Sequence, residues 1–165
     1  MTLVAGVDPG GTTASLALAG LDGTIVCESK IATESYGGAQ QVLERIADGI
    51  LALASEADEN PAALGIGLPG LVDMCAGTSR FLPNLPTNWV DVEVATTLSS
   101  LVGCPVEVIN DARAATLGEL RYGHGREASS LALFTLGTGI GGGIAIDGKL
   151  RLGPIGAAGA LGHRA

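Results

Sequence analysis

The sequence predicts an α/β protein with a mixed sheet, and two observations support this fold class. Three short apolar runs, at residues 3–7, 14–19 and 25–31, are separated by turn signals, which is typical of antiparallel strands. From residue 38 onward, segments with helical spacing alternate with short apolar runs, as in αβ units. The expected order is β-β-β-α-β-α-β-α followed by β-β, a mixed sheet with helices on its faces.

The opening strands are defined by their turns. The first run ends at Asp8-Pro9-Gly10-Gly11-Thr12-Thr13, and Asp22-Gly23 separates the second run from the third. Asp-Gly tolerates positive φ and favours a hairpin. We therefore expect three antiparallel strands at the N-terminus.

The remaining elements follow from changes in period. Apolar residues recur at helical spacing between residues 38 and 55. Gly103 fits the stop of a second helix at 91–102, and Asp111 is a candidate N-cap for a third at 112–122. Strands are expected at 63–68, 106–109, 130–136 and 142–146. Residues 73–89 read as irregular, and residues 153–165 as a Gly/Ala-rich loop.

Composition excludes several classes of protein. The chain has 165 residues and a net charge of −8, and a surface of that sign repels phosphate backbones, so no nucleic-acid partner is expected. No apolar stretch is long enough to span a bilayer. Cys27, Cys75 and Cys104 form neither a disulfide framework nor a CxxC pair. We expect a cytoplasmic protein with reduced thiols and no membrane association.

The first turn has the composition of an anion site. Gly10 and Gly11 let the backbone close around a ligand, and its N–H groups together with the hydroxyls of Thr12 and Thr13 are suitable donors. Asp8 is suited to hold a hydrated Mg²⁺. An ordinary hairpin turn with a solvated carboxylate explains the same residues equally well.

A second strand, Gly/Thr turn and strand unit favours the anion site. It spans residues 135–143 and contains Thr138 and Gly139. Two such turns facing each other across a cleft would hold a polyphosphate from both sides. The GxGxxG match at 137–142 is not a dinucleotide fingerprint, because a strand pattern follows it instead of a helix.

Asn110-Asp111 lies between a predicted strand and a predicted helix. A carboxylate in this place can accept a proton from a substrate hydroxyl, and the neighbouring amide can orient a sugar ring. Asp111 can equally be a plain N-cap. The spacing alone leaves both interpretations open.

Taken together, these residues resemble a known family. The chain is similar over essentially all of its length to the N-terminal half of a ROK-family sugar kinase, a group that includes bacterial glucokinases. Each motif is weak alone, but their order and spacing are specific. The motifs that carry the likeness are Asp8-Pro9-Gly10-Gly11-Thr12-Thr13, Gly65-Ile66-Gly67-Leu68-Pro69-Gly70-Leu71-Val72-Asp73, Asn84-Leu85-Pro86-Thr87-Asn88-Trp89, Val108-Ile109-Asn110-Asp111-Ala112-Arg113-Ala114-Ala115, Leu136-Gly137-Thr138-Gly139-Ile140-Gly141-Gly142-Gly143 and Gly156-Ala157-Ala158-Gly159-Ala160-Leu161-Gly162-His163.

The resemblance implies an actin-like ATPase fold, in which two ribonuclease H-like domains close over ATP and a sugar. Residues 1–122 would form the first domain, and residues 123–165 an incomplete start of the second. The implied activity is ATP-dependent phosphorylation of a hexose or N-acetylhexosamine in carbohydrate metabolism. The partners would be a small sugar and ATP with Mg²⁺, and a homodimer is possible.

The resemblance also implies residue roles. Asp111 would be the general base that deprotonates the sugar hydroxyl, as phosphoryl transfer mainly requires positioning and charge stabilisation. The phosphate contacts would come from Asp8, Gly10, Gly11, Thr12, Thr13, Thr138 and Gly139. The sugar contacts would come from Gly70, Asn84, Asn110, Asp111 and His163.

The sequence departs from the family pattern in three respects. Ala160 stands where the family has Glu, which would accept hydrogen bonds from two sugar hydroxyls, so weaker binding or a changed sugar preference is expected. The chain ends at Ala165, before the family's Cys-rich zinc loop, so we expect no zinc site and allow for a truncated or partial protein. Thr13 and Arg113 replace a common Lys and a common Asn.

Two other functions are compatible with the resemblance. A non-catalytic sugar-binding regulator would share this domain, although the turn at Asp8 leaves no room before it for a helix-turn-helix module. An inactive kinase fragment is a related possibility. An unrelated ATPase of the same superfold, such as an activator of a radical dehydratase, is disfavoured because the three cysteines lack the spacing of an iron–sulfur site.

Overall fold

The computed structural model describes residues 1–82, 85, 87–136 and 140–152. The chain forms two compact units, residues 1–109 and residues 110–165. Among the described residues, no helix combines the length and the apolar character needed to cross a membrane.

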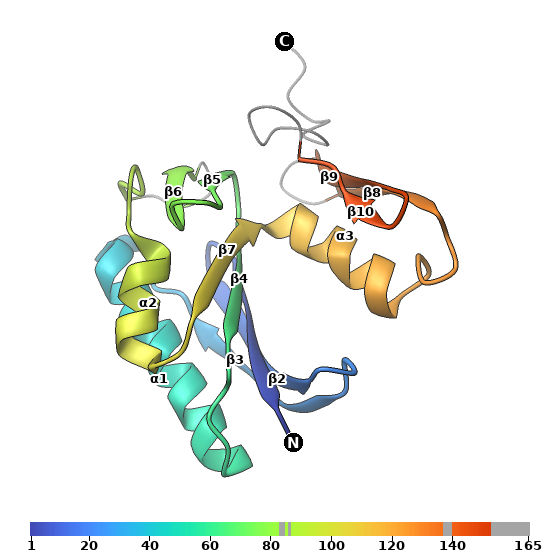
Figure 1. The fold of residues 1–165 in the computed structure, drawn as a ribbon. Helices are drawn as coiled ribbons and strands as arrows, with labels where there is room; N and C mark the ends of the chain where they lie inside the picture. The colour runs from blue at the N-terminus through green and yellow to red at the C-terminus, as the bar shows by residue number, and fades with distance from the viewer. Residues whose placement is uncertain (83–84, 86, 137–139, 153–165) are drawn as a thin grey trace. The chain divides into compact units, whose positions relative to one another are not determined.

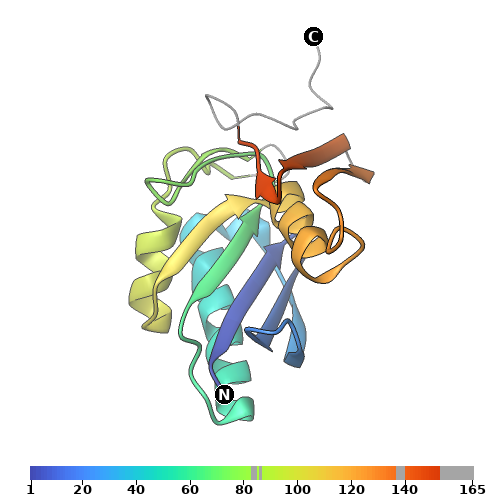
Figure 2. The same ribbon diagram turned by 45° about the vertical axis from the view of Figure 1, so that its right-hand side comes forward.

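The first unit is built on a five-stranded sheet (Figure 1). Its strands are β1 (Leu3–Pro9), β2 (Thr13–Gly20), β3 (Ile25–Ala32), β4 (Leu64–Leu68) and β7 (Val106–Asn110), in the order β3-β2-β1-β4-β7. Strand β2 is antiparallel to both β1 and β3, whereas β1 and β4 are parallel. The predicted antiparallel opening and the mixed sheet are both confirmed. In Figure 2 the arrows of β1, β4 and β7 run in the same direction.

Helices α1 (Ala39–Ala57) and α2 (Val94–Val102) lie on the same face of this sheet. The alternation along the strands explains why, because β1 and β2 bury every second residue. Apolar side chains at helical spacing on α1 cover that buried row. Gly103 ends α2 in the left-handed conformation with φ 79, as predicted. The fully buried side chains include Leu16, Leu18, Leu43, Ile46, Ile50, Ile66 and Leu98.

The segment expected to be irregular contains a hairpin. Strands β5 (Leu71–Asp73) and β6 (Thr78–Phe81) pair antiparallel, so the prediction for residues 73–89 is wrong in this part. Gly77 has φ 67 in the connection, a conformation that glycine adopts without steric cost. A short 3₁₀ helix, η1 (Ser35–Gly37), was also not predicted.

The second unit consists of α3 (Asp111–Tyr122) and the sheet β10-β9-β8. Its strands are β8 (Ser130–Leu136), β9 (Ile140–Ile146) and β10 (Lys149–Leu150). Helix α3 packs closely on β9, because a Cβ added to Gly141 would lie 3.2 Å from Ala112 Cβ and one added to Gly143 would overlap Thr116. Strand β9 occupies the place where a dinucleotide fingerprint needs a helix.

The division of the chain differs from the expected boundary at residues 122 and 123. The second compact unit begins at Asn110, because α3 packs on β8 and β9. The assignment of residues 1–122 and 123–165 to two ATPase domains stays a prediction.

Candidate functional site

The turn between β1 and β2 holds the first group of candidate residues. Asp8 is exposed and lies near the end of β1, opposite Ser15 in the antiparallel ladder with β2. The Gly10 N–H donates to the carbonyl oxygen of Thr13 at 2.9 Å. A Cβ on Gly10 would lie 2.9 Å from that same oxygen, so the tight turn requires glycine there.

The carbonyl oxygens of this turn are held by the segment that follows β3. The Thr33 hydroxyl donates to Gly10 O and the Ser35 hydroxyl donates to Gly11 O, each at 2.8 Å. The Thr33 N–H donates to Thr12 O at 2.9 Å. With respect to the described part of the chain, the amides of Gly11 and Thr12 have no hydrogen-bond acceptor. Adjacent backbone N–H groups of this kind are suited to bind an anion.

Gly70 lies between β4 and β5 and is half-buried, with φ 102. This left-handed backbone favours glycine. Because β1 and β4 are parallel, Asp8 near the end of β1 and Gly70 just after β4 lie toward the same edge of the sheet. Ligands of open α/β sheets bind beyond this edge.

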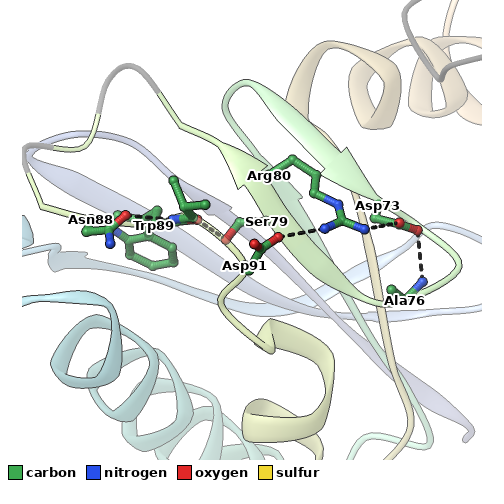
Figure 3. A network of polar contacts seen from close by, with 8 residues as sticks. Asp73, Ala76, Ser79, Arg80, Asn88, Trp89 and Asp91 are labelled. Atoms are coloured by element: carbon green, nitrogen blue, oxygen red, sulfur yellow. Dashed lines mark hydrogen bonds and ion pairs between the residues drawn. The ribbon is translucent and has the colours of Figure 1, made fainter.

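A polar network fixes the β5–β6 hairpin next to Gly70 (Figure 3). The Arg80 guanidinium donates to Asp73 Oδ2 at 2.8 Å and to Asp91 Oδ1 at 2.6 Å. The Ala76 N–H donates to Asp73 Oδ1 at 3.0 Å. Two hydrogen bonds lower the pKa of the Asp73 carboxyl: the one from the Ala76 N–H has the larger effect, and the one from Arg80 has the next largest.

The same hairpin holds the end of the segment that contains the Asn84 to Trp89 motif. The Ser79 hydroxyl donates to Trp89 O, and the Asp91 N–H donates to Ser79 O at 2.8 Å. The Trp89 side chain is only 2% exposed. The end of this motif is therefore anchored in the core of the first unit, while Asn84 itself lies outside the described residues.

Asn110 and Asp111 stand at the junction of β7 and α3. Asn110, not Asp111, is the N-cap, because Asn110 Oδ1 accepts from the Arg113 N–H at 3.3 Å. The expectation that Asp111 caps the helix is therefore wrong. The physical reason is that Asn110 keeps extended dihedrals, φ −69 and ψ 140, whereas Asp111 is already the first residue of the helix.

The Asp111 carboxylate has a defined orientation. Its Oδ1 accepts from the Ala112 N–H at 2.7 Å and from Asn110 Nδ2 at 2.9 Å. Its position in the first turn of α3 also suits a negative charge. Asn110 thus caps α3 with its oxygen and orients Asp111 with its nitrogen.

Arg113 follows in the same turn and is 5% exposed. Desolvation lowers the pKa of its guanidinium. The sequence showed only that Arg113 replaces a residue that is commonly Asn in the family. It did not predict that the Arg113 side chain is buried.

The predicted site residues are divided among three groups. The first unit contains Asp8, Gly10, Gly11, Thr12, Thr13 and Gly70, and the second begins with Asn110 and Asp111. The residues that lie outside the described part are Asn84, Thr138, Gly139 and His163.

Sequence reasoning missed the residues that support the site. Thr33, Ser35 and Arg80 were not singled out, since a lone hydroxyl or arginine has no local signature. The Gly77 turn between two short strands was the one available signal for the hairpin.

No group of three or more His, Cys, Asp or Glu side chains suited to a metal ion occurs among the described residues. Asp8 presents one exposed carboxylate near the end of β1, the strand that precedes the turn. Mg²⁺ keeps several waters and takes one or two carboxylates together with phosphates. Asp8 therefore supplies one carboxylate, too few to hold such an ion without water or phosphate ligands.

Known structures identify the class of protein to which this fold belongs. A crystal structure of a ROK family glucokinase from Streptomyces griseus in complex with glucose and AMPPNP matches with a TM-score of 0.88 and 36% identity. The match covers 98% of this chain and 50% of that one. The fold is that of the actin-like ATPases.

The family model gives the narrower assignment. The sequence matches the ROK family over residues 4–165, and the chain belongs to this family.

Curated relatives include both kinases and repressors. The glucokinase of Thermotoga maritima is 42% identical over 158 residues, which are 96% of this chain and 49% of that protein. The xylose repressor of Caldicellulosiruptor bescii is 30% identical over 163 residues, 97% of this chain and 40% of the repressor. The chain thus spans about half the length of the glucokinases that it matches.

Proposed function

We propose that this protein phosphorylates a hexose or N-acetylhexosamine with ATP, as a glucokinase-like enzyme. The observation that carries the proposal is the turn at Gly10 to Thr13, whose carbonyls are all bonded within the chain. A turn held in this way directs N–H groups at a ligand, as phosphate requires. Similarity to glucokinases supports the choice of a sugar as acceptor.

In this proposal Asp111 is the general base. It takes the proton of the attacking sugar hydroxyl while the oxygen forms a bond to the γ-phosphorus of ATP, and ADP leaves. The hydrogen bonds from Asn110 and Ala112 to Asp111 Oδ1 fix the direction of the carboxylate before substrate binds. Such a positioned base contributes about 10²–10⁴-fold in rate.

The sugar and nucleotide contacts remain part of the proposal. Gly70, Asn84, Asn110 and His163 would bind the sugar, and Thr138 and Gly139 would meet the phosphates opposite the first turn. Asp8 would hold Mg²⁺ through water, and the ion would neutralise charge on the phosphates. Residues 1–122 and 123–165 would belong to the two closing domains.

A second candidate is a sugar-binding regulator without catalysis. The similarity to a xylose repressor favours it, as does Ala160 in place of the family Glu. Such a protein would bind sugar through the same residues but would not release ADP from ATP. A kinase fragment without activity of its own is the related alternative.

The test is ADP release from Mg-ATP with glucose, mannose, fructose, N-acetylglucosamine or N-acetylmannosamine, and without sugar. ADP that depends on one sugar supports the kinase and names its substrate. Calorimetry with the same sugars separates the alternatives, since sugar binding without ADP release favours the regulator.

The matched variant is Asp111→Asn, which keeps the size of the side chain and removes its basicity. We expect it to lower kcat by about 10²–10⁴-fold, because the amide cannot accept the proton of the sugar hydroxyl. Undiminished turnover would remove Asp111 from the role of base.

A further inference from the structure

We propose that Thr33 and Ser35 are positioning residues that hold the Gly10–Thr13 turn in its anion-binding form. The inference rests on the proposed function, because it takes the turn to bind the phosphates of a nucleotide. It assigns a role to a segment that is distant in sequence from every motif of the resemblance.

The hydrogen bonds of this segment are directed at the turn. Two hydroxyls and one backbone N–H from Thr33 and Ser35 bond three successive carbonyls of the turn, at 2.8–2.9 Å. Both side chains are nearly inaccessible, with Thr33 1% and Ser35 3% exposed. Buried hydroxyls need partners, and the turn supplies both of them.

The backbone between the two hydroxyls is strained. Glu34 has φ 49 and ψ 46, a left-handed conformation that non-glycine residues rarely adopt. Strained residues persist where the surrounding structure over-determines them, and they cluster at functional sites. Here the left-handed residue Glu34 lies between Thr33 and Ser35, whose hydroxyls both donate hydrogen bonds to the Gly10–Thr13 turn.

Two side chains, Arg45 and Thr87, make three polar contacts with the segment around Glu34. Arg45 of α1 donates from Nε to Ala32 O at 3.1 Å, and its Nη1 lies 3.0 Å from Glu34 Oε2. The Thr87 hydroxyl donates to Ser35 O at 3.2 Å. The segment is therefore fixed both by the helix that covers the sheet and by the chain following Asn84.

The consequence concerns the direction of the amides. A peptide group whose carbonyl is bonded toward the protein has its N–H directed away from that bond. The carbonyls of Gly10 and Gly11 belong to the peptide groups that carry the N–H of Gly11 and of Thr12. Bonds from Thr33 and Ser35 therefore set the direction of these two amides before a ligand arrives, which reduces the cost of ordering on binding.

The experiment uses the ¹⁵N-labelled chain of residues 1–165. Amide exchange of Gly10 is compared with that of Leu16 in the core, and Mg-ATP is titrated while the Gly11 and Thr12 amides are followed. Thr33→Val removes a hydroxyl at nearly constant shape, and Thr33→Ser retains it. Thr116→Val is the control, because Thr116 is equally buried and its hydroxyl donates to Ala112 O at 2.7 Å within α3.

Thr33→Val is expected to raise Gly10 exchange relative to Leu16 by about tenfold, since local opening becomes easier. It should weaken Mg-ATP binding by about tenfold, the loss typical of one hydrogen bond. Thr33→Ser should restore both the Gly10 exchange rate relative to Leu16 and the affinity for Mg-ATP. Thr116→Val should change neither of these two quantities. If Thr33→Val does not fold, Ser35→Ala carries the same test by removing the other hydroxyl.

Two outcomes overturn the proposal in distinguishable ways. Unchanged Gly10 exchange and unchanged Mg-ATP affinity in both Thr33→Val and Ser35→Ala would show that the hydroxyls do not hold the turn. Wild-type protein whose Gly11 and Thr12 amides do not respond to Mg-ATP would remove the phosphate ligand. That second result contradicts the proposed function itself, whatever the exchange rates.

Discussion

The two compact units reach close packing by opposite means. In residues 1–109, large aliphatic side chains such as Leu16, Leu43 and Ile66 fill the space between sheet and helices. In the second unit, α3 approaches β9 at Gly141 and Gly143, where an added Cβ would meet Ala112 or Thr116. The core of the first unit depends on the volume of its side chains, whereas this contact in the second unit depends on the lack of a side chain at two glycines.

The outer face of the β8–β9 sheet completes the contrast. Phe134, Leu136 and Ile140 are 59%, 81% and 52% exposed. Leu136 lies opposite Ile140 in the ladder, and Phe134 lies opposite Gly142. These three large apolar residues of the second unit are therefore exposed, whereas Leu131 and Leu133 on the alternate positions of β8 are half-buried.

The largest expected effect is in the first core. Leu43→Ala should lower the free energy of unfolding by about 2–5 kcal/mol, through lost burial and a cavity. Leu51→Ala on the same helix is the matched control, because Leu51 is 40% exposed whereas Leu43 is 0% exposed. Equal losses in urea denaturation would contradict the core assigned to this unit.

The second unit should be sensitive to an added methyl group. Gly143→Ala places a Cβ against Thr116 and should cost about 1–3 kcal/mol by overpacking. Hydrogen exchange of the β9 amides would report it. Gly65→Ala is the control, since no atom lies within 4 Å of the Cβ position there. Thr116→Ala should partly rescue Gly143→Ala.

The outer face of β8 should tolerate change. Phe134→Thr is expected to alter stability by no more than about 0.5 kcal/mol, as is usual for exposed positions. Leu133→Thr, on the side of the strand that is half-buried, should cost more. A large loss in thermal stability for Phe134→Thr would mean that this face is covered in solution.

The smallest effect concerns the polar hairpin of the first unit. Hydrogen bonds from Ala76 and Arg80 to the ionised Asp73 carboxylate hold its pKa below the ordinary value of 3.8. Their stabilisation of the folded state is therefore fully present at pH values above 3.8. This stabilisation is lost as the pH falls through the lower pKa that Asp73 has in the folded state. Trp89 is the single tryptophan, so its fluorescence between about pH 5 and pH 2 should report the change.

Asp73→Asn should remove this acid transition, because the amide does not titrate. Asp22→Asn is the control: the pKa of Asp22 is also lowered, by hydrogen bonds from Thr24, and Asp22 lies in the turn between β2 and β3. A transition unchanged in Asp73→Asn would exclude Asp73 as its source.

Apolar runs, turn signals and helical spacing made much of the fold predictable. Apolar runs bounded by turns identified β1 and β2, and helical spacing identified α1, each to within two residues of its ends. The order of strands and helices was enough to predict a mixed sheet. The hairpin at β5 and β6 was missed because its strands have three and four residues, too few for a period to appear.

The sequence by itself determined which residue types stand at the ends of the strands, and with them the turn at Gly10 and the pair Asn110-Asp111. It did not determine which of that pair caps α3, because both side chains are good caps and only the backbone dihedrals separate them. Nor did it reveal Thr33 and Ser35, whose bonds join residues 23 and 24 positions apart. Such pairings leave no local pattern, since only the folded sheet brings the end of β3 beside the turn that follows β1.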